Sequence, residues 1–106
     1  MSLHADLTEQ TFDEALVAAD GLVMVDFWAP WCGPCRALAP VLEALAETFQ
    51  GRVSLMKVNV DEQSALAARY EIRAIPTVLF LRGGTVVDRV VGVVPRAALE
   101  AIIATR

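Results

Sequence analysis

The chain has 106 residues, 56% of them hydrophobic, and this length fits one compact domain without a second core. Its formal net charge is −4 and its nine Lys and Arg are scattered, so we do not expect a nucleic-acid partner. Charged residues interrupt each apolar segment before it reaches the ~18 residues that a membrane span needs, so no membrane association is expected. The interrupting residues are Asp26, Lys57, Arg82 and Asp88. We therefore interpret residues 1–106 as a single domain.

The first ten residues, MSLHADLTEQ, contain neither the basic region nor the apolar core of a secretory signal. This pattern predicts a cytoplasmic protein, although an exported protein whose signal has been removed would look the same. In a reducing cytosol, a pair of cysteines is more often redox-active or metal-binding than structural. The compartment therefore bears directly on how the two cysteines of this chain are interpreted.

The first half of the chain predicts a helix, a strand and a longer helix. Residues 11–14 (TFDE) are typical of a capping box, and apolar residues at helical spacing follow until Asp20-Gly21. The apolar run at residues 22–28 (LVMVDFW) predicts a strand covered on both faces. A longer helix then ends at Gly51, and Pro40 inside it should produce a kink because proline removes one backbone donor. Its apolar face consists of Leu38, Val41, Leu42, Leu45, Ala46 and Phe49.

The second half predicts a strand over residues 53–60, a short helix over residues 64–70 and then a hairpin. The hairpin joins two β-rich runs, residues 77–82 and 85–91, through Gly83-Gly84.

A last helix is predicted to begin with Pro95 as its first residue. The residues expected to be buried on this helix are Ala98, Leu99, Ile102 and Ile103. Alternating helices and strands followed by a hairpin and a closing helix indicate an α/β fold with a mixed sheet covered on both faces.

Residues 31–35 (WCGPC) contain both cysteines of the chain. A Cys-x-x-Cys between a buried strand and a helix places its first sulfur near the helix N-terminus, where free amides and the helix dipole favour a thiolate. Cys32 is therefore predicted to be the nucleophile, and Cys35, one turn further in, the resolving residue. Gly33 lets a partner backbone approach, and Pro34 stiffens the first turn without removing a needed donor.

The predicted reaction is sequential: Cys32 attacks a substrate disulfide, and Cys35 then displaces the substrate thiol from the mixed disulfide. A structural bridge is one alternative, but closing so short a ring gives little stabilisation. A zinc site is another, but it needs four ligands and His4 is the only further soft ligand. No metal is therefore expected, and His4 is interpreted as a solvated side chain.

Asp26 and Lys57 each interrupt an apolar strand. A carboxyl group in that position should be desolvated with a raised pKa, which makes Asp26 a candidate proton acceptor for Cys35. The alternative is a buried structural ion pair between Asp26 and Lys57. Both interpretations can hold at once, with Lys57 coupled to the catalytic step.

Residues 27–35 (FWAPWCGPC), followed by residues 75–77 (IPT) and by Gly84 before the last strand, resemble the thioredoxin family, and the resemblance covers essentially the whole chain. It implies a thioredoxin fold: a central five-stranded mixed β-sheet flanked by four α-helices. It also implies a general protein dithiol-disulfide oxidoreductase that binds no cofactor beyond the redox-active Cys32-Cys35 disulfide.

The resemblance implies partners as well. Electrons would come indirectly from NADPH through a flavoprotein, thioredoxin reductase. The clients would be disulfide-containing proteins of the ribonucleotide reductase, peroxiredoxin and methionine sulfoxide reductase types, and the protein would be a monomer.

The resemblance further implies that Pro76 is cis, faces the cysteines and lies beside backbone that pairs with an extended substrate. The apolar substrate-binding rim would comprise Trp31, Ala74, Ile75, Pro76, Val91 and Gly92. Alternatively, Trp31 and Ile75 are partly buried core contacts and Pro76 is an ordinary edge proline. Trp28 is expected to pack beneath the turn.

The sequence departs from the family pattern at a few positions. Arg36 replaces the commoner lysine, Ala74 occupies a position that is often glycine, and Val93 and Val94 make the stretch after Gly92 unusually apolar. Ala74 is expected to narrow access to the site slightly.

Two rival functions remain open at this stage. One is a disulfide oxidant or isomerase of the same fold. The resemblance argues against it, because Gly33-Pro34 between the cysteines is typical of a reducing protein. The other is a non-catalytic thioredoxin-like binding module, in which the cysteines are incidental.

Overall fold

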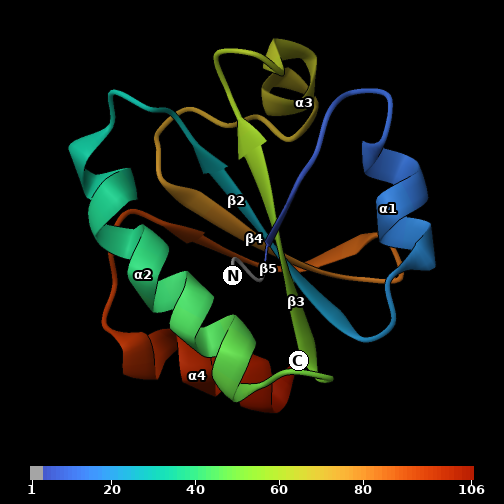
Figure 1. Ribbon diagram of the computed structural model, residues 1–106, viewed down its shortest axis with the longest axis vertical. Helices are drawn as coiled ribbons and strands as arrows, with labels where there is room; N and C mark the ends of the chain where they lie inside the picture. The colour runs from blue at the N-terminus through green and yellow to red at the C-terminus, as the bar shows by residue number, and fades with distance from the viewer. Residues whose placement is uncertain (1–3) are drawn as a thin grey trace.

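The computed structural model describes residues 4–106 and contains a five-stranded sheet in the order β1-β3-β2-β4-β5 (Figure 1). The strands are β1 (His4–Asp6), β2 (Leu22–Trp28), β3 (Val53–Asn59), β4 (Thr77–Arg82) and β5 (Thr85–Val91). The helices are α1 (Phe12–Ala18), α2 (Gly33–Thr48), α3 (Ser64–Arg69) and α4 (Arg96–Thr105).

The sheet is mixed, as the sequence predicts. β1 and β2 both pair in parallel with β3, whereas β4 runs antiparallel to β2 and β5 antiparallel to β4. β2 therefore lies at the centre, with a hydrogen-bonded neighbour on each side, and the segment that leaves its carboxyl end starts from the middle of the sheet.

Each face of the sheet packs against its own pair of helices. Met24 and Leu55 contribute to one buried cluster with residues of α2 and α4, while Val25 and Val58 belong to a second cluster with residues of α1 and α3. Figure 1 shows α2 and α4 together on one side of the sheet. Successive residues of a strand point to opposite faces, so a strand buried on both sides needs a continuous apolar run. Asp26 is the one acidic residue within the run of β2.

One predicted capping bond and one predicted helix start differ from the structure. The Thr11 side chain caps no helix amide, because its hydroxyl oxygen instead accepts a hydrogen bond from the Thr8 amide at 3.0 Å. Pro95 precedes α4 as its N-cap instead of forming its first residue. Two predicted ends are one residue too long, since β3 ends at Asn59 and α3 at Arg69.

The predicted burial of Ala98 is wrong: this side chain is exposed, whereas Leu99 and Ile103 are 0% and 2% exposed. The buried face of α4 is formed by Leu99 and, one turn later, Ile103. Ala98 lies to one side of this face. Ile102 is partly buried at the edge of the same face.

The fifth strand, β1, was implied by the resemblance but not located by the sequence pattern. It has three residues, too few for any periodic signal, and it forms an edge of the sheet beside β3. The expectation that His4 is a solvated side chain is wrong: its ring contacts the Glu43 carboxylate on α2 and lies 3.4 Å from Asp6.

α2 continues through Pro40. The proline ring has no N–H to donate to the carbonyl oxygen of Arg36 one turn earlier. Within residues 4–106, no helix is long and apolar enough to cross a membrane.

Candidate active site

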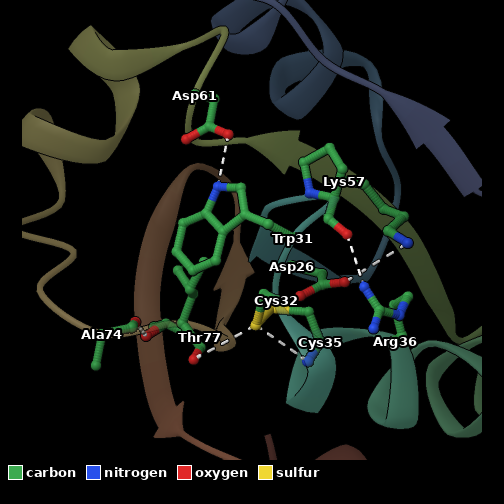
Figure 2. The surroundings of a disulfide bond; sticks show 11 residues. Asp26, Trp31, Cys32, Cys35, Arg36, Lys57, Asp61, Ala74 and Thr77 are labelled. Atoms are coloured by element: carbon green, nitrogen blue, oxygen red, sulfur yellow. Dashed lines mark hydrogen bonds and ion pairs between the residues drawn. A yellow bond between two sulfur atoms is a disulfide. The ribbon is translucent and has the colours of Figure 1, made fainter.

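The cysteine turn connects the carboxyl end of β2 to the start of α2. Cys32 is the N-cap of the helix, with extended backbone, and its amide donates to the Ala29 carbonyl at 3.1 Å. The Arg36 amide donates to the Cys32 carbonyl at 3.2 Å, and the Arg36 guanidinium donates to the Pro30 carbonyl at 2.8 Å (Figure 2). These three bonds hold the turn from both sides, and Arg36 donates two of them, one from its amide and one from its guanidinium.

Cys32 and Cys35 form a disulfide with their Cα atoms 5.2 Å apart. Both side chains are buried, at 4% and 2% exposed. The Cys35 amide donates a hydrogen bond to the Cys32 sulfur at 3.2 Å. This amide belongs to the first helical turn and has no carbonyl partner within the helix, so it is available to stabilise negative charge on that sulfur after reduction.

Gly33 and Pro34 occupy the exposed first turn of α2. No atom lies within 4 Å of the point where a β-carbon of Gly33 would stand. The outer side of the turn is therefore open.

Asp26 lies on β2 and is 1% exposed. Among the described residues, neither of its oxygens accepts a hydrogen bond, and the Lys57 ammonium lies 3.8 Å from Oδ2 (Figure 2). Burial raises the pKa of Asp26 from the ordinary 3.8 to about 6, and the positive charge of Lys57 opposes that rise. The ion pair expected as one interpretation is thus present, and it leaves the carboxyl group incompletely satisfied.

Trp28 packs against the small cluster formed by Ala29, Cys32 and Cys35, as expected. The Lys57 ammonium lies 4.8 Å from the centre of the Trp28 ring. A cation over the face of an indole ring is attracted by its π-electrons, so Trp28 helps to hold Lys57 near Asp26.

The segment before β4 approaches the cysteines from the other side. The Ile75-Pro76 peptide bond is cis, as the resemblance implies, and Pro76 is buried. The Ile75 carbonyl oxygen lies 3.8 Å from the Cys32 sulfur, and the Gly92 amide donates to the Pro76 carbonyl at 2.8 Å. Residues 75 and 76 are therefore placed beside Cys32, with residue 92 beside them.

The predicted rim residues differ in exposure. Trp31 is 67% exposed and its indole N–H donates to Asp61 at 2.8 Å, so the core-contact interpretation is wrong for Trp31 (Figure 2). Ile75 is partly buried and packs against the cysteine cluster, so it is a core contact that still exposes part of its side chain beside the site. Val91 is 55% exposed and Gly92 is partly exposed.

A shallow hollow of about 190 Å³ lies beside Trp31 and reaches Ala74 and Ile75. Its other lining residues are Val60, Ala67, Ile72 and Arg73, which the sequence pattern did not single out. The link between Trp31 and Asp61 was also missed, although Asp61 directly follows a predicted strand whose end should lie near the site. Among residues 4–106, no group of three or more His, Cys, Asp or Glu side chains is placed to hold a metal ion.

Comparison with known proteins identifies the class. The family model described as Thioredoxin matches residues 4–105. Thioredoxin 1 of Nostoc sp. is 48% identical over 100 residues, which cover 94% of each chain. Thioredoxin 1 of Synechococcus elongatus is 46% identical over 93% of this chain and 92% of its own. The chloroplastic M-type thioredoxin of Pisum sativum is 45% identical over 89% of this chain and 55% of its own.

This protein is thus a dithiol-disulfide oxidoreductase built on an α/β sheet, with its cysteine pair at the start of a helix. The chain belongs to the thioredoxin family, whose members are protein-disulfide reductases.

Proposed function

We propose that Cys32 is the nucleophile and Cys35 the resolving cysteine of a general protein-disulfide reductase. The hydrogen bond from the Cys35 amide to the Cys32 sulfur, at 3.2 Å, carries this proposal. It singles out one sulfur of the pair for stabilisation as a thiolate at a helix N-terminus.

In the first step the Cys32 thiolate attacks one sulfur of a client disulfide. A bond forms between the two sulfurs, the client disulfide breaks, and the other client sulfur leaves as a thiolate that takes a proton from water. In the second step Cys35 loses its proton and attacks the Cys32 sulfur. The Cys32-Cys35 disulfide forms, the second client sulfur leaves and is protonated, and the client has gained two electrons.

Asp26 is the proposed acceptor of the Cys35 proton. Its pKa of about 6 leaves the carboxyl group mostly ionised at neutral pH, and close enough to neutrality to exchange a proton readily. Lys57, 3.8 Å from Asp26, moderates the cost of ionising a carboxyl group that is buried and accepts no hydrogen bond within residues 4–106. Lys57 is in this sense coupled to the proton transfer.

Client recognition is proposed to rest on main-chain pairing beside Pro76 and on apolar contact with the surrounding rim. The residues assigned to that rim are Trp31, Ala74, Ile75, Pro76, Val91 and Gly92. Main-chain pairing reads no particular side chain, so a broad range of clients follows. Gly33 and Pro34 shape the turn, and Pro40 the helix that carries it.

The source of electrons is proposed to be NADPH, delivered by a flavoprotein thioredoxin reductase. The proposed clients are disulfide proteins of the ribonucleotide reductase, peroxiredoxin and methionine sulfoxide reductase types. We further propose that residues 1–106 act as a single domain and as a cytoplasmic monomer, and that the disulfide is the protein's only redox group.

The test is reduction of insulin disulfides in the presence of NADPH and thioredoxin reductase, with NADPH oxidation as the readout. The intact protein should turn over, and Cys32→Ser should abolish turnover. Cys35→Ser should stop after one step, with a client covalently attached to Cys32. A protein with both thiols intact and no turnover would overturn the proposal and favour the binding module.

The direction of electron flow is tested separately. Equilibration of the cysteine pair with reduced and oxidised glutathione gives its reduction potential. A potential near that of thioredoxins, about −270 mV by the general scale, supports a reductase. A potential nearer the strong oxidants, about −120 mV, supports the oxidant instead.

A further inference from the structure

Three charged residues form a row across three adjacent strands. Asp6 on β1 is the direct partner of Lys57 on β3, and Lys57 is in turn the direct partner of Asp26 on β2. Directly paired residues point to the same face of a sheet. Lys57 therefore has a carboxyl group on each side, one buried and one 76% exposed.

His4 extends this row. It lies two positions before Asp6, so both side chains share a face of the sheet. Its Nε2 lies 3.4 Å from Asp6 Oδ1, and its Nδ1 contacts Glu43 Oε1 on α2. The ring is thus placed between two carboxyl groups and is only 22% exposed. A protonated ring completes an alternation of charge that runs through Glu43, His4, Asp6, Lys57 and Asp26.

The row also borders a hollow that lies apart from the proposed client-binding rim. A hollow of about 270 Å³ is lined by Asp6, Lys57 and Trp28, with Glu62 as the other acidic side chain at its wall. Its lining includes neither Trp31 nor Pro76. Protons can therefore exchange with Asp6 and Lys57 while a client covers the cysteines.

We propose that His4 is a positioning residue for Asp26, acting through Asp6 and Lys57. A protonated His4 holds the Asp6 carboxylate and leaves the Lys57 ammonium to Asp26. A neutral His4 releases Asp6, which then competes with Asp26 for Lys57. The proposal deepens the function assigned to Asp26 above and rests on it.

The charges of Lys57 and His4 both change the pKa of Asp26 in the direction that the proposal requires. Burial raises the pKa of Asp26, while the charge of Lys57 and, to a smaller extent, that of His4 lower it. His4 and Asp26 lie two strands apart in the sheet order and two residues out of register, which places them about 12 Å apart at the usual strand spacing and rise. A unit charge at that distance changes a titration midpoint by about 0.25 pH unit in water and by about 1 pH unit at an effective dielectric constant of about 20.

The test is an NMR titration of the Asp26 carboxyl carbon in the oxidised protein. His4→Gln is neutral at every pH and His4→Lys remains charged up to alkaline pH. We expect His4→Gln to raise the Asp26 midpoint by about 0.25 to 1 pH unit, and His4→Lys to keep or lower it. Equal midpoints in the intact protein and both variants would overturn the proposal.

A double-mutant cycle tests the route of the effect. In a Lys57→Met background, the part of the His4→Gln effect that acts through Lys57 should disappear, so that only the direct effect of the His4 charge on Asp26 remains. An undiminished effect there would contradict the role of Lys57. Asp6→Asn should lower the Asp26 midpoint, while Asp20→Asn, an exposed change of equal charge, should leave it unaltered.

Asp6→Asn also serves where His4→Gln loosens β1, since it keeps the His4 contact with Glu43. An unchanged Asp26 midpoint in Asp6→Asn contradicts the proposal even if His4→Gln does not fold. The titration needs no turnover, so it separates this proposal from the assignment of Asp26. If Asp26→Asn leaves the Cys35 step at full rate, the proposed function of Asp26 fails while the His4 coupling stands.

Discussion

The Cys35 backbone amide donates to the Cys32 sulfur across 3.2 Å, and this amide belongs to the first turn of α2. The two cysteines are therefore chemically unequal, although both are buried in the disulfide. One sulfur faces a helix N-terminus, and the other lies deeper in the helix that supplies the amide.

The first prediction concerns this inequality. After reduction, iodoacetamide at pH 7 should modify Cys32 in at least about tenfold excess over Cys35, because the thiolate is the reactive form. Peptide mass spectrometry after partial alkylation measures the ratio. Equal modification of both residues in the folded protein, or preference for Cys35, would contradict the assignment of the nucleophile.

The second prediction concerns stability. The pKa of Asp26 is about 6 when folded and 3.8 ordinarily, so between these values the folded state binds more protons than the unfolded state. Its contribution to the free energy of unfolding is therefore present below pH 3.8 and lost as the pH rises through 6. The loss is roughly 3 kcal/mol, from 2.2 pH units at 1.36 kcal/mol each.

Asp26→Asn does not titrate, so its stability relative to the intact protein should increase by roughly 2 kcal/mol between pH 4 and pH 7.5, because part of the total loss falls below pH 4. Urea unfolding at the two pH values measures this difference. Comparing the two pH values cancels the fixed effect of placing an amide in that site. A relative stability that is independent of pH would show that Asp26 ionises as an ordinary carboxyl group.

The third prediction concerns the resolving step. Asp26→Asn should slow release of client from the mixed disulfide at pH 7 by about 100-fold, because a positioned general base contributes about 10²–10⁴. Acid quenching followed by mass spectrometry measures the accumulated intermediate. Alkylation of Cys32 serves as the control and should change much less, since Asp26 is assigned to Cys35.

The fourth prediction concerns the docking surface. Trp31 is 67% exposed, so Trp31→Ala should change the free energy of unfolding by less than about 0.5 kcal/mol. It should raise KM for a protein client about 30-fold, the effect of losing roughly 2 kcal/mol from an aromatic contact.

Val17→Ala is the matched control for Trp31→Ala, because Val17 is 85% exposed and lies on α1. Its KM should equal that of the intact protein. A Trp31→Ala variant with normal KM would remove this residue from the client surface. Asp61→Asn, which weakens the 2.8 Å hydrogen bond to the indole, should have a smaller effect in the same direction.

The sequence allowed prediction of the fold wherever a residue pattern repeats. β2 and the hairpin strands match their predicted ranges because apolar runs and paired glycines mark them clearly. β1 has only three residues, so its place beside β3 depends on contacts that no local pattern encodes. Thr11 followed the capping pattern, yet Thr8, three residues earlier, offered its hydroxyl a competing partner.

The candidate site was predictable for similar reasons. Asp26 stands out because it is a charged residue within an apolar strand. Cys32 and Cys35 stand out because both cysteines of the chain lie in one short turn. The position of Asp61 against Trp31, and of Arg36 against Pro30, depends on side chains reaching across turns. His4 was misjudged because its partner Glu43 lies 39 residues away on another element.

The burial of the disulfide limits how many proteins can reach it at one time. Cys35 is enclosed at 2% exposed, and the segment at Ile75 and Pro76 closes around Cys32. A protein that delivers electrons and one that withdraws them must therefore occupy the same patch in turn. The electron donor and the electron acceptor therefore compete for one binding surface. A large excess of either protein slows the reaction with the other, although the chemical steps are unchanged.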